Sequence, residues 1–250
     1  MSLTEFIDDL IVTEKPSVAE AFAKALTGNK HRIIRINGVK TFRFNIDGRR
    51  WATIGLKGHI FNYDFEPQYN SWKKVDPQIL FQVEPIRIIE RTSNRYVEAL
   101  KTLARHAENI YLALDADTEG ESISFEVIDI IRKINPYGEF KRLWFNSTVK
   151  EELLRALKDP QTPQKLLAEK CFARMKVDLI IGAAYTRLLT IAVQRSDAYA
   201  LPFGRFLSYG PCQSPTLYLV VERAWQREKF KTKKFYNIKA DIEIYGAIYE

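Results

Sequence analysis

Four carboxylates fall within seven consecutive residues of this chain, in the segment Asp115-Ala116-Asp117-Thr118-Glu119-Gly120-Glu121. Asp115, Asp117 and Glu119 alternate directly after a short apolar run, so an extended backbone would aim their carboxylates to one side. Carboxylates held this close repel one another, and a bound cation would relieve the repulsion. Oxygen ligands that leave positions for water and phosphate oxygens are typical of Mg²⁺. The cluster therefore predicts a magnesium site that handles phosphate groups.

A second charged pair, Glu14-Lys15, follows the apolar run at residues 10–12 and precedes a helical pattern that begins near Pro16. Both charged segments thus leave a predicted strand and open a helix. Such loops meet at one edge of a parallel sheet, which would place Glu14 beside Asp115 and Asp117. A carboxylate, a lysine and a metal-holding group are what phosphoryl transfer requires.

Three other interpretations compete with the magnesium site. The segment from Asp115 to Glu126 matches an EF-hand loop at positions 1, 3, 5, 6 and 12, although position 5 is the longer Glu119 and Ser122 stands where an apolar residue is expected. The acidic residues could instead complement the dipole of a helix start, and Glu14-Lys15 could be ordinary loop charges. Neither of these two accounts for both loops together.

The elements around these loops follow from hydrophobic period and turn residues. Alternation over residues 31–65, interrupted by Asn37-Gly38 and Asp47-Gly48, predicts hairpins. Apolar spacing predicts helices over 93–107, 122–132 and 164–194, with a buried strand at 110–114 between the first two. Thr148 and Glu151 form a capping-box pattern before a further helix, and residues 235–250 alternate like strands.

Composition fits a packed globular protein, with 46% hydrophobic and 28% charged residues. The net charge is +7, and residues 141–210 hold 12 basic against 6 acidic side chains, which favours an anionic partner such as nucleic acid. We find neither a run of about 18 apolar residues nor a secretory signal, and expect a cytosolic address. Two cysteines without CxxC spacing and three scattered histidines indicate neither a disulfide framework nor a zinc site.

Five segments, in order along the chain, resemble a known family. LIVTEKPSVAEAFAKAL and LALDADTEGE look like the two signatures of the Toprim domain, which occurs in topoisomerases, primases and some nucleases. FNSTVKEELLRAL, ARMKVDLIIGAAYTRLL and LSYGPCQSPTLYLVVERAWQREKF resemble the segments that follow Toprim in type IA DNA topoisomerases, and SYGPCQ is closest to the topoisomerase III branch of eukaryotes and archaea.

This resemblance implies roles for individual residues. The residues that match the family's Mg²⁺-associated acids are Glu14, Asp115, Asp117 and Glu119. Lys15 matches the lysine implicated in proton transfer at the scissile phosphate. Arg174 matches an arginine near DNA and Gln213 the glutamine of a Gly-x-x-Gln segment, although Arg174 could simply pair with Asp178 and Gln213 could cap a helix start. His59 matches a Gly-His pair of the family, but a lone histidine is more often structural.

The resemblance further implies an α/β Toprim domain, Rossmann-like with a largely parallel sheet, over residues 1–142. An all-α DNA-binding domain would follow over 143–226, and a partial β segment, the start of an arch domain, over 227–250. The implied activity is ATP-independent, Mg²⁺-dependent breakage, passage and rejoining of single DNA strands through a tyrosyl phosphate. None of the 12 tyrosines lies in a Tyr-Pro-Arg-Thr-like segment. We therefore expect these 250 residues to bind single-stranded DNA without relaxing supercoils.

The implied partners are Mg²⁺ and DNA, with no membrane and no organic cofactor, in the nucleoid or the nucleus. One rival is another Toprim enzyme, primase-like or nuclease-like, which would lack the topoisomerase segments after residue 145. The other rival is a non-catalytic DNA-binding module with a vestigial acidic loop. Equal Mg²⁺ binding by the unchanged chain and an Asp117→Asn variant would favour that module.

Overall fold

The computed structural model describes residues 6–72, 74–197, 199–202, 205–240, 242–245 and 247–249. The chain divides into two compact units, Met1–Ser208 and Tyr209–Glu250, and each is described by itself. The domain boundaries predicted at residues 142 and 226 differ from this division and stay a prediction.

A six-stranded sheet forms the centre of the first unit, in the order β2-β3-β4-β1-β7-β8. The strands are β1 (Asp9–Thr13), β2 (Arg32–Ile36), β3 (Val39–Ile46), β4 (Arg49–Gly55), β7 (Asn109–Ala113) and β8 (Glu139–Arg142). β1 runs parallel to β4 and β7, and β7 runs parallel to β8, whereas β2 and β3 are antiparallel additions. This confirms the predicted α/β class with a largely parallel sheet.

The antiparallel edge is built by the two turn dipeptides found in the sequence. In Asn37-Gly38 the φ angles are 49° and 79°, and in Asp47-Gly48 they are 49° and 78°. Two consecutive positive φ values are what a two-residue type I′ hairpin requires, and Asn-Gly and Asp-Gly supply them at low cost. The predicted hairpins are therefore present.

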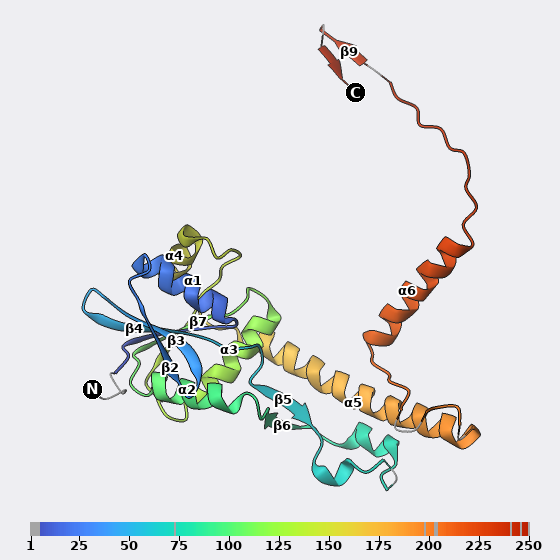
Figure 1. Ribbon diagram of the computed structural model, residues 1–250, viewed down its shortest axis with the longest axis horizontal. Helices are drawn as coiled ribbons and strands as arrows, with labels where there is room; N and C mark the ends of the chain where they lie inside the picture. The colour runs from blue at the N-terminus through green and yellow to red at the C-terminus, as the bar shows by residue number, and fades with distance from the viewer. Residues whose placement is uncertain are drawn as a thin grey trace. The chain divides into compact units, whose positions relative to one another are not determined.

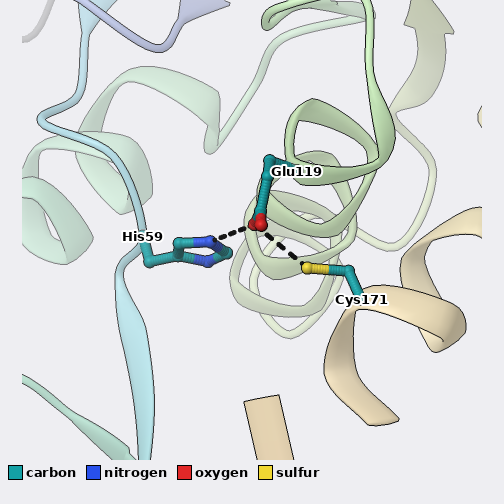
Figure 2. A group of neighbouring side chains, drawn as sticks. All are labelled: His59, Glu119 and Cys171. Carbon is teal, nitrogen blue, oxygen red and sulfur yellow. Dashed lines mark hydrogen bonds and ion pairs between the residues drawn. The ribbon is translucent and has the colours of Figure 1, made fainter. Parts of the chain in front are cut away.

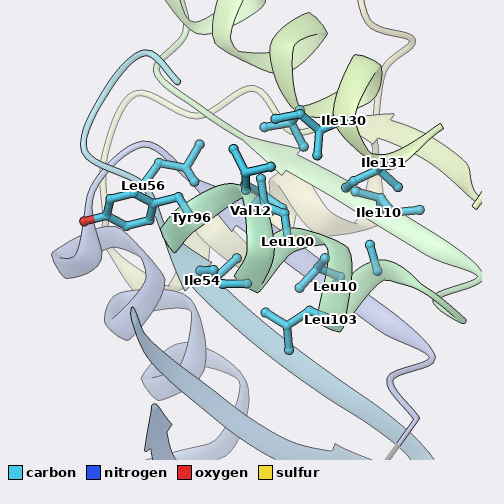
Figure 3. Packing of buried hydrophobic residues seen from close by; sticks show 14 of the residues in the cluster. Leu10, Val12, Ile54, Leu56, Tyr96, Leu100, Leu103, Ile110, Ile130 and Ile131 are labelled. Atoms are coloured by element: carbon cyan, nitrogen blue, oxygen red, sulfur yellow. The ribbon is translucent and has the colours of Figure 1, made fainter. Parts of the chain in front are cut away.

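Helices cover both faces of the sheet (Figure 1). They are α1 (Pro16–Thr27), α2 (Asn94–Ala104), α3 (Thr118–Ile131) and α4 (Lys150–Lys158). Leu10 and Val12 of β1 point into a core shared with α2 and α3, where Leu100 and Leu103 are buried (Figure 3). Ile11, between them in sequence, points into the opposite core with α1 and α4. Successive side chains of β1 thus point to opposite faces of the sheet and contribute to two separate apolar layers.

One predicted helix start is wrong. Thr148 and Glu151 do not form a capping box, because Val149 and not Thr148 occupies the N-cap of α4. The N–H of Val149 donates to Ser147 Oγ at 3.3 Å. With the helix starting at Lys150, Glu151 lies one position too early to complete the box.

The rest of the first unit is a hairpin, two short 3₁₀ turns and a long helix. These are β5 (Phe61–Asp64), β6 (Ile86–Ile89), η1 (Pro67–Tyr69), η2 (Pro77–Gln82) and α5 (Lys165–Ser196). α5 packs against α3 and η2, where Ala184 lies in a small apolar cluster with Phe65 and Leu80. Arg187 donates to the Tyr69 carbonyl at 2.5 Å, which ties the middle of α5 to η1.

By length and composition alone, α5 is apolar enough to cross a membrane, and 17% of its most apolar window is buried. This test tolerates up to two charged residues in its window, so a helix can pass it without an unbroken run of about 18 apolar residues. The finding carries little weight for a membrane, because a packing helix of a soluble protein passes the same test. Here the helix carries the nearly buried Arg187 and makes the apolar contacts just described.

The second unit contains α6 (Gln213–Glu228) and a hairpin of β9 (Ile242–Ile244) with β10 (Ala247–Tyr249). The alternation predicted from residue 235 onward thus forms strands only in its last part.

The ion pair of Asp8 with Arg50 should make the stability of the fold depend on pH in the acidic range. Its carboxylate accepts bonds from Arg50 Nη2 at 2.6 Å, Arg50 Nε at 2.9 Å and the Arg50 backbone N–H at 2.8 Å. The hydrogen bond from the Arg50 side chain is the main cause that lowers the pKa of Asp8 from 3.8 to about 2. Its stabilisation is therefore present above pH 4 and disappears as the pH falls through about 2.

We expect Asp8→Asn to cost about 1–2 kcal/mol of unfolding free energy near neutral pH, and the difference from the unchanged chain to shrink on acidification. Urea denaturation of both proteins at a series of pH values measures this. A difference that stays constant from neutral pH down to about 2 would contradict the assignment.

Candidate metal centre

The two charged loops predicted to converge do meet. β1 and β7 are parallel neighbours in which Thr13 pairs with Ala113, so the loops that follow them leave the same sheet edge. Lys15 Nζ lies 2.9 Å from Asp115 Oδ2 and 3.6 Å from Glu14 Oε1. The structure therefore brings Glu14, Lys15 and Asp115 together across 100 residues of sequence.

The electrostatics of this edge favour a cation. Burial and then the charge of Asp115 raise the pKa of Glu14, with a smaller contribution from Asp117 in the same direction. The hydrogen bond to Asp115 is the main cause that raises the pKa of Lys15, so the ammonium stays charged at neutral pH. Excess negative charge beside a half-exposed Asp115 is an environment that a hard divalent ion would relieve, and the oxygen donors fit Mg²⁺.

Asp117 has a second task. It is the N-cap of α3, and its Oδ1 accepts the Gly120 N–H at 2.7 Å, which satisfies one of the free donors at the helix start. Its charge nevertheless acts on Glu14 from this position. The interpretation of these acids as a helix start is thus correct for Asp117, and it does not conflict with a role near the metal.

Glu119 does not follow the expected pattern. The prediction of one extended segment with three carboxylates on one side is wrong, because α3 begins at Thr118 and Glu119 lies in its first turn. Its Oε2 lies 3.0 Å from His59 Nε2 and accepts the Cys171 thiol at 3.0 Å (Figure 2). Arg174 donates to its Oε1. Burial tends to raise the pKa of Glu119, but the bonds from Cys171, His59 and Arg174 outweigh it and lower that pKa.

His59 is held between two carboxylates. Its Nδ1 lies 2.9 Å from Glu126 Oε1, and this contact is the main cause that raises the pKa of His59 to about 9. Glu126 Oε2 accepts the backbone N–H of Ile60 at 2.7 Å. Glu126 is buried and belongs to this network, so the twelfth position of an EF-hand is not available to Asp115, and the EF-hand interpretation is excluded.

The structure places Arg174 and Gln213 in different units of the chain. Arg174, on α5, forms an ion pair with Glu119, so the expected alternative of a pair with Asp178 is not its main contact. Gln213 is the first residue of α6 in the second unit, but Cys212 occupies the N-cap and no side chain among the described residues caps this helix, so the expected alternative of a capping Gln213 is not what the structure shows. The roles of both at DNA stay a prediction.

Arg142 is a residue of this region that the sequence did not reveal. Its side chain is completely buried and pairs with the equally buried Glu121 at 2.7 Å. The guanidinium also donates to the carbonyl of Leu112 in β7, to those of Leu114 and Asp115 in the loop beyond it, and to that of the neighbouring Leu143. Arg142 therefore fixes the backbone that carries Asp115. A single arginine in a short edge strand offers no spacing signal by which to find it.

Comparison with known proteins matches two successive parts of the chain. The Toprim domain model matches residues 9–148, and a DNA topoisomerase model matches residues 162–250. DNA topoisomerase 3-alpha of Arabidopsis thaliana is 32% identical over 92% of this chain and 26% of its own length. DNA topoisomerase 3 of Schizosaccharomyces pombe is 33% identical over 92% of this chain and 38% of its own, and DNA topoisomerase 1 of Archaeoglobus fulgidus is 32% identical over 94% and 34%.

Among solved structures, full-length topoisomerase I of Thermotoga maritima matches 89% of this chain and 31% of its own with a TM-score of 0.55 and 25% identity. The chain thus spans between about a quarter and two-fifths of the length of these relatives. A Toprim fold with converging acidic loops, followed by a region that matches the DNA topoisomerase model, makes this chain a member of the type IA DNA topoisomerase family.

Proposed function

We propose that this chain supplies the metal-binding and DNA-holding part of a type IA topoisomerase that breaks, passes and rejoins single DNA strands without ATP, with Mg²⁺ as its ion. The observation that carries the proposal is the contact of Lys15 with Asp115 beside Glu14, which unites the two Toprim loops at one sheet edge. The match of residues 162–250 to the topoisomerase model favours this function over a primase-like or nuclease-like one.

The residues at this edge of the sheet would have different roles. Glu14, Asp115 and Asp117 would hold the ion, which when bound supplies positive charge against a phosphate oxygen. Lys15 is half-exposed and fully protonated, so its ammonium is available to bind a phosphate oxygen or to donate a proton to a leaving oxygen. Arg142 and the Asp117 cap hold the loop in place before substrate arrives. Because DNA is the substrate proposed here, we place the protein in the nucleoid or the nucleus.

Binding of a fluorescent single-stranded oligonucleotide, measured by anisotropy at several salt concentrations, tests the DNA-holding part of the proposal. We expect the affinity to fall steeply with salt, with a slope of about −0.7 for each phosphate contact in a log–log plot. Lys15→Gln should weaken binding and reduce the size of this slope by about 0.7, the contribution of one phosphate contact.

Lys101→Gln is the matched control, because Lys101 on α2 is an exposed lysine paired with Glu98 at 2.8 Å. It should leave both affinity and slope unchanged. A flat salt response, or equal effects of the two substitutions, would count against the proposal. Supercoil relaxation by these 250 residues alone would show that the strand is cut without the family's tyrosine segment.

A further inference from the structure

Three potential metal ligands from three separate elements converge on one point of the first unit. His59 comes from the segment between β4 and β5, Glu119 from the first turn of α3 and Cys171 from α5 (Figure 2). Their ligand atoms, a nitrogen, an oxygen and a sulfur, lie within 4.8 Å of one another. No short sequence motif indicates this group, because Glu119 lies 60 residues after His59 and 52 residues before Cys171.

The histidine is oriented as a metal-bound histidine is. Glu126 takes Nδ1, and Glu126 is itself buried and fixed by the Ile60 N–H at 2.7 Å. This leaves Nε2 directed at Glu119 Oε2. Histidines that bind metals almost always give their other ring nitrogen to a carboxylate or carbonyl, which fixes the ring and the tautomer. Glu126 fills that supporting position.

The two carboxylate oxygens of Glu119 have different partners. Arg174 takes Oε1 of Glu119, and Oε2 lies 3.0 Å from both His59 Nε2 and Cys171 Sγ. One oxygen is thus directed toward the same space as the nitrogen and the sulfur. Cys171 is 3% exposed, while the side chains of His59 and Glu119 are partly exposed to solvent.

We propose that His59, Glu119 and Cys171 form a binding site for a transition-metal ion of the Zn²⁺ class, separate from the magnesium edge at Glu14 and Asp115. Imidazole, thiolate and one carboxylate oxygen are ligands that Zn²⁺ accepts, with a fourth position open to water. Mg²⁺ prefers oxygen ligands and an octahedral shell, which this group does not offer.

Binding replaces two protons by one ion. The imidazole proton at Nε2 and the thiol proton of Cys171 pass to solvent, and the metal takes their place between the three side chains. The ion then joins the β4–β5 segment, α3 and α5, and it stabilises the fold by an amount that grows with the logarithm of its concentration relative to its Kd. The site does not depend on the proposed topoisomerase function.

Titration of the reduced 250-residue chain with Co²⁺, followed by optical absorption under anaerobic conditions, tests the site. We expect a thiolate-to-cobalt charge-transfer band that Zn²⁺ abolishes and excess Mg²⁺ does not. Cys171→Ser should abolish the band, whereas Cys212→Ser, which removes the exposed cysteine of the second unit, should retain it. Glu126→Gln should weaken Co²⁺ binding by about 10–100-fold.

Far-ultraviolet circular dichroism of each variant checks that it is folded, and Cys171→Ser differs from the unchanged chain by a single atom. Absence of the band from the unchanged chain, or its retention in Cys171→Ser, would overturn the site. Asp115→Asn separates the two proposals. It should abolish Mg²⁺ binding and leave the cobalt band intact, so failure of one site is visible without failure of the other.

Discussion

Arg142→Met is expected to lower the free energy of unfolding by about 3–5 kcal/mol, because it leaves the carboxylate of Glu121 buried without its partner. Both side chains are fully inaccessible in the folded chain. The same substitution removes the donor for the Leu112, Leu114, Leu143 and Asp115 carbonyls. Urea denaturation at neutral pH measures the loss, and Mg²⁺ titration should show weaker binding because the Asp115 loop is no longer held.

Two further variants isolate the cause. Arg142→Met combined with Glu121→Leu removes the uncompensated charge and should be more stable than Arg142→Met alone. Arg155→Met breaks an exposed pair with Glu152 on α4 and should leave stability unchanged. If the double variant were no more stable than the single one, the buried charge would not be the source of the cost.

Gly120→Ala should displace the loop that carries Asp115. A Cβ at this position would lie 1.9 Å from the Asp115 carbonyl oxygen and 3.0 Å from Arg142 Nη2. The helix start and the Asp115 backbone cannot both keep their positions, so the loop must move. We expect a loss of about 1–3 kcal/mol in unfolding free energy, together with a clear loss of Mg²⁺ affinity.

Gly38→Ala is the control for this effect. Gly38 has a φ of +79° and open space around its Cβ position, so its substitution strains the hairpin without touching the loops. It should lower stability while leaving Mg²⁺ affinity as it was. Equal affinities in Gly120→Ala and Gly38→Ala would show that the close approach of Gly120 to Asp115 does not position the metal ligands.

The parts of the fold that the sequence predicted are those that local chemistry determines. The dipeptides Asn37-Gly38 and Asp47-Gly48 are each sufficient to predict a hairpin turn. The apolar runs before Glu14 and Asp115 are likewise sufficient to predict buried strands. Their convergence then follows from parallel pairing, because the loops after neighbouring parallel strands leave one edge.

The parts that failed depend on partners distant in sequence. Glu119 lies in the first turn of α3 and contacts His59 and Cys171, which are 60 and 52 residues away in sequence and approach it only in the folded chain. Arg142 gains its role from carbonyls of β7, about 30 residues upstream. Periodicity describes which face of an element is buried, and it contains no information on which polar group will meet another.

We propose that Glu14, Asp115 and Asp117 together hold one divalent ion between the two Toprim loops. Crystals of the chain soaked in Mn²⁺, which has oxygen preferences close to those of Mg²⁺ and scatters anomalously, test it most directly. We expect an anomalous peak at about 2.0–2.2 Å from carboxylate oxygens of Glu14 and Asp115, with Lys15 Nζ moved away from Asp115. A map with no peak between these two loops would contradict it.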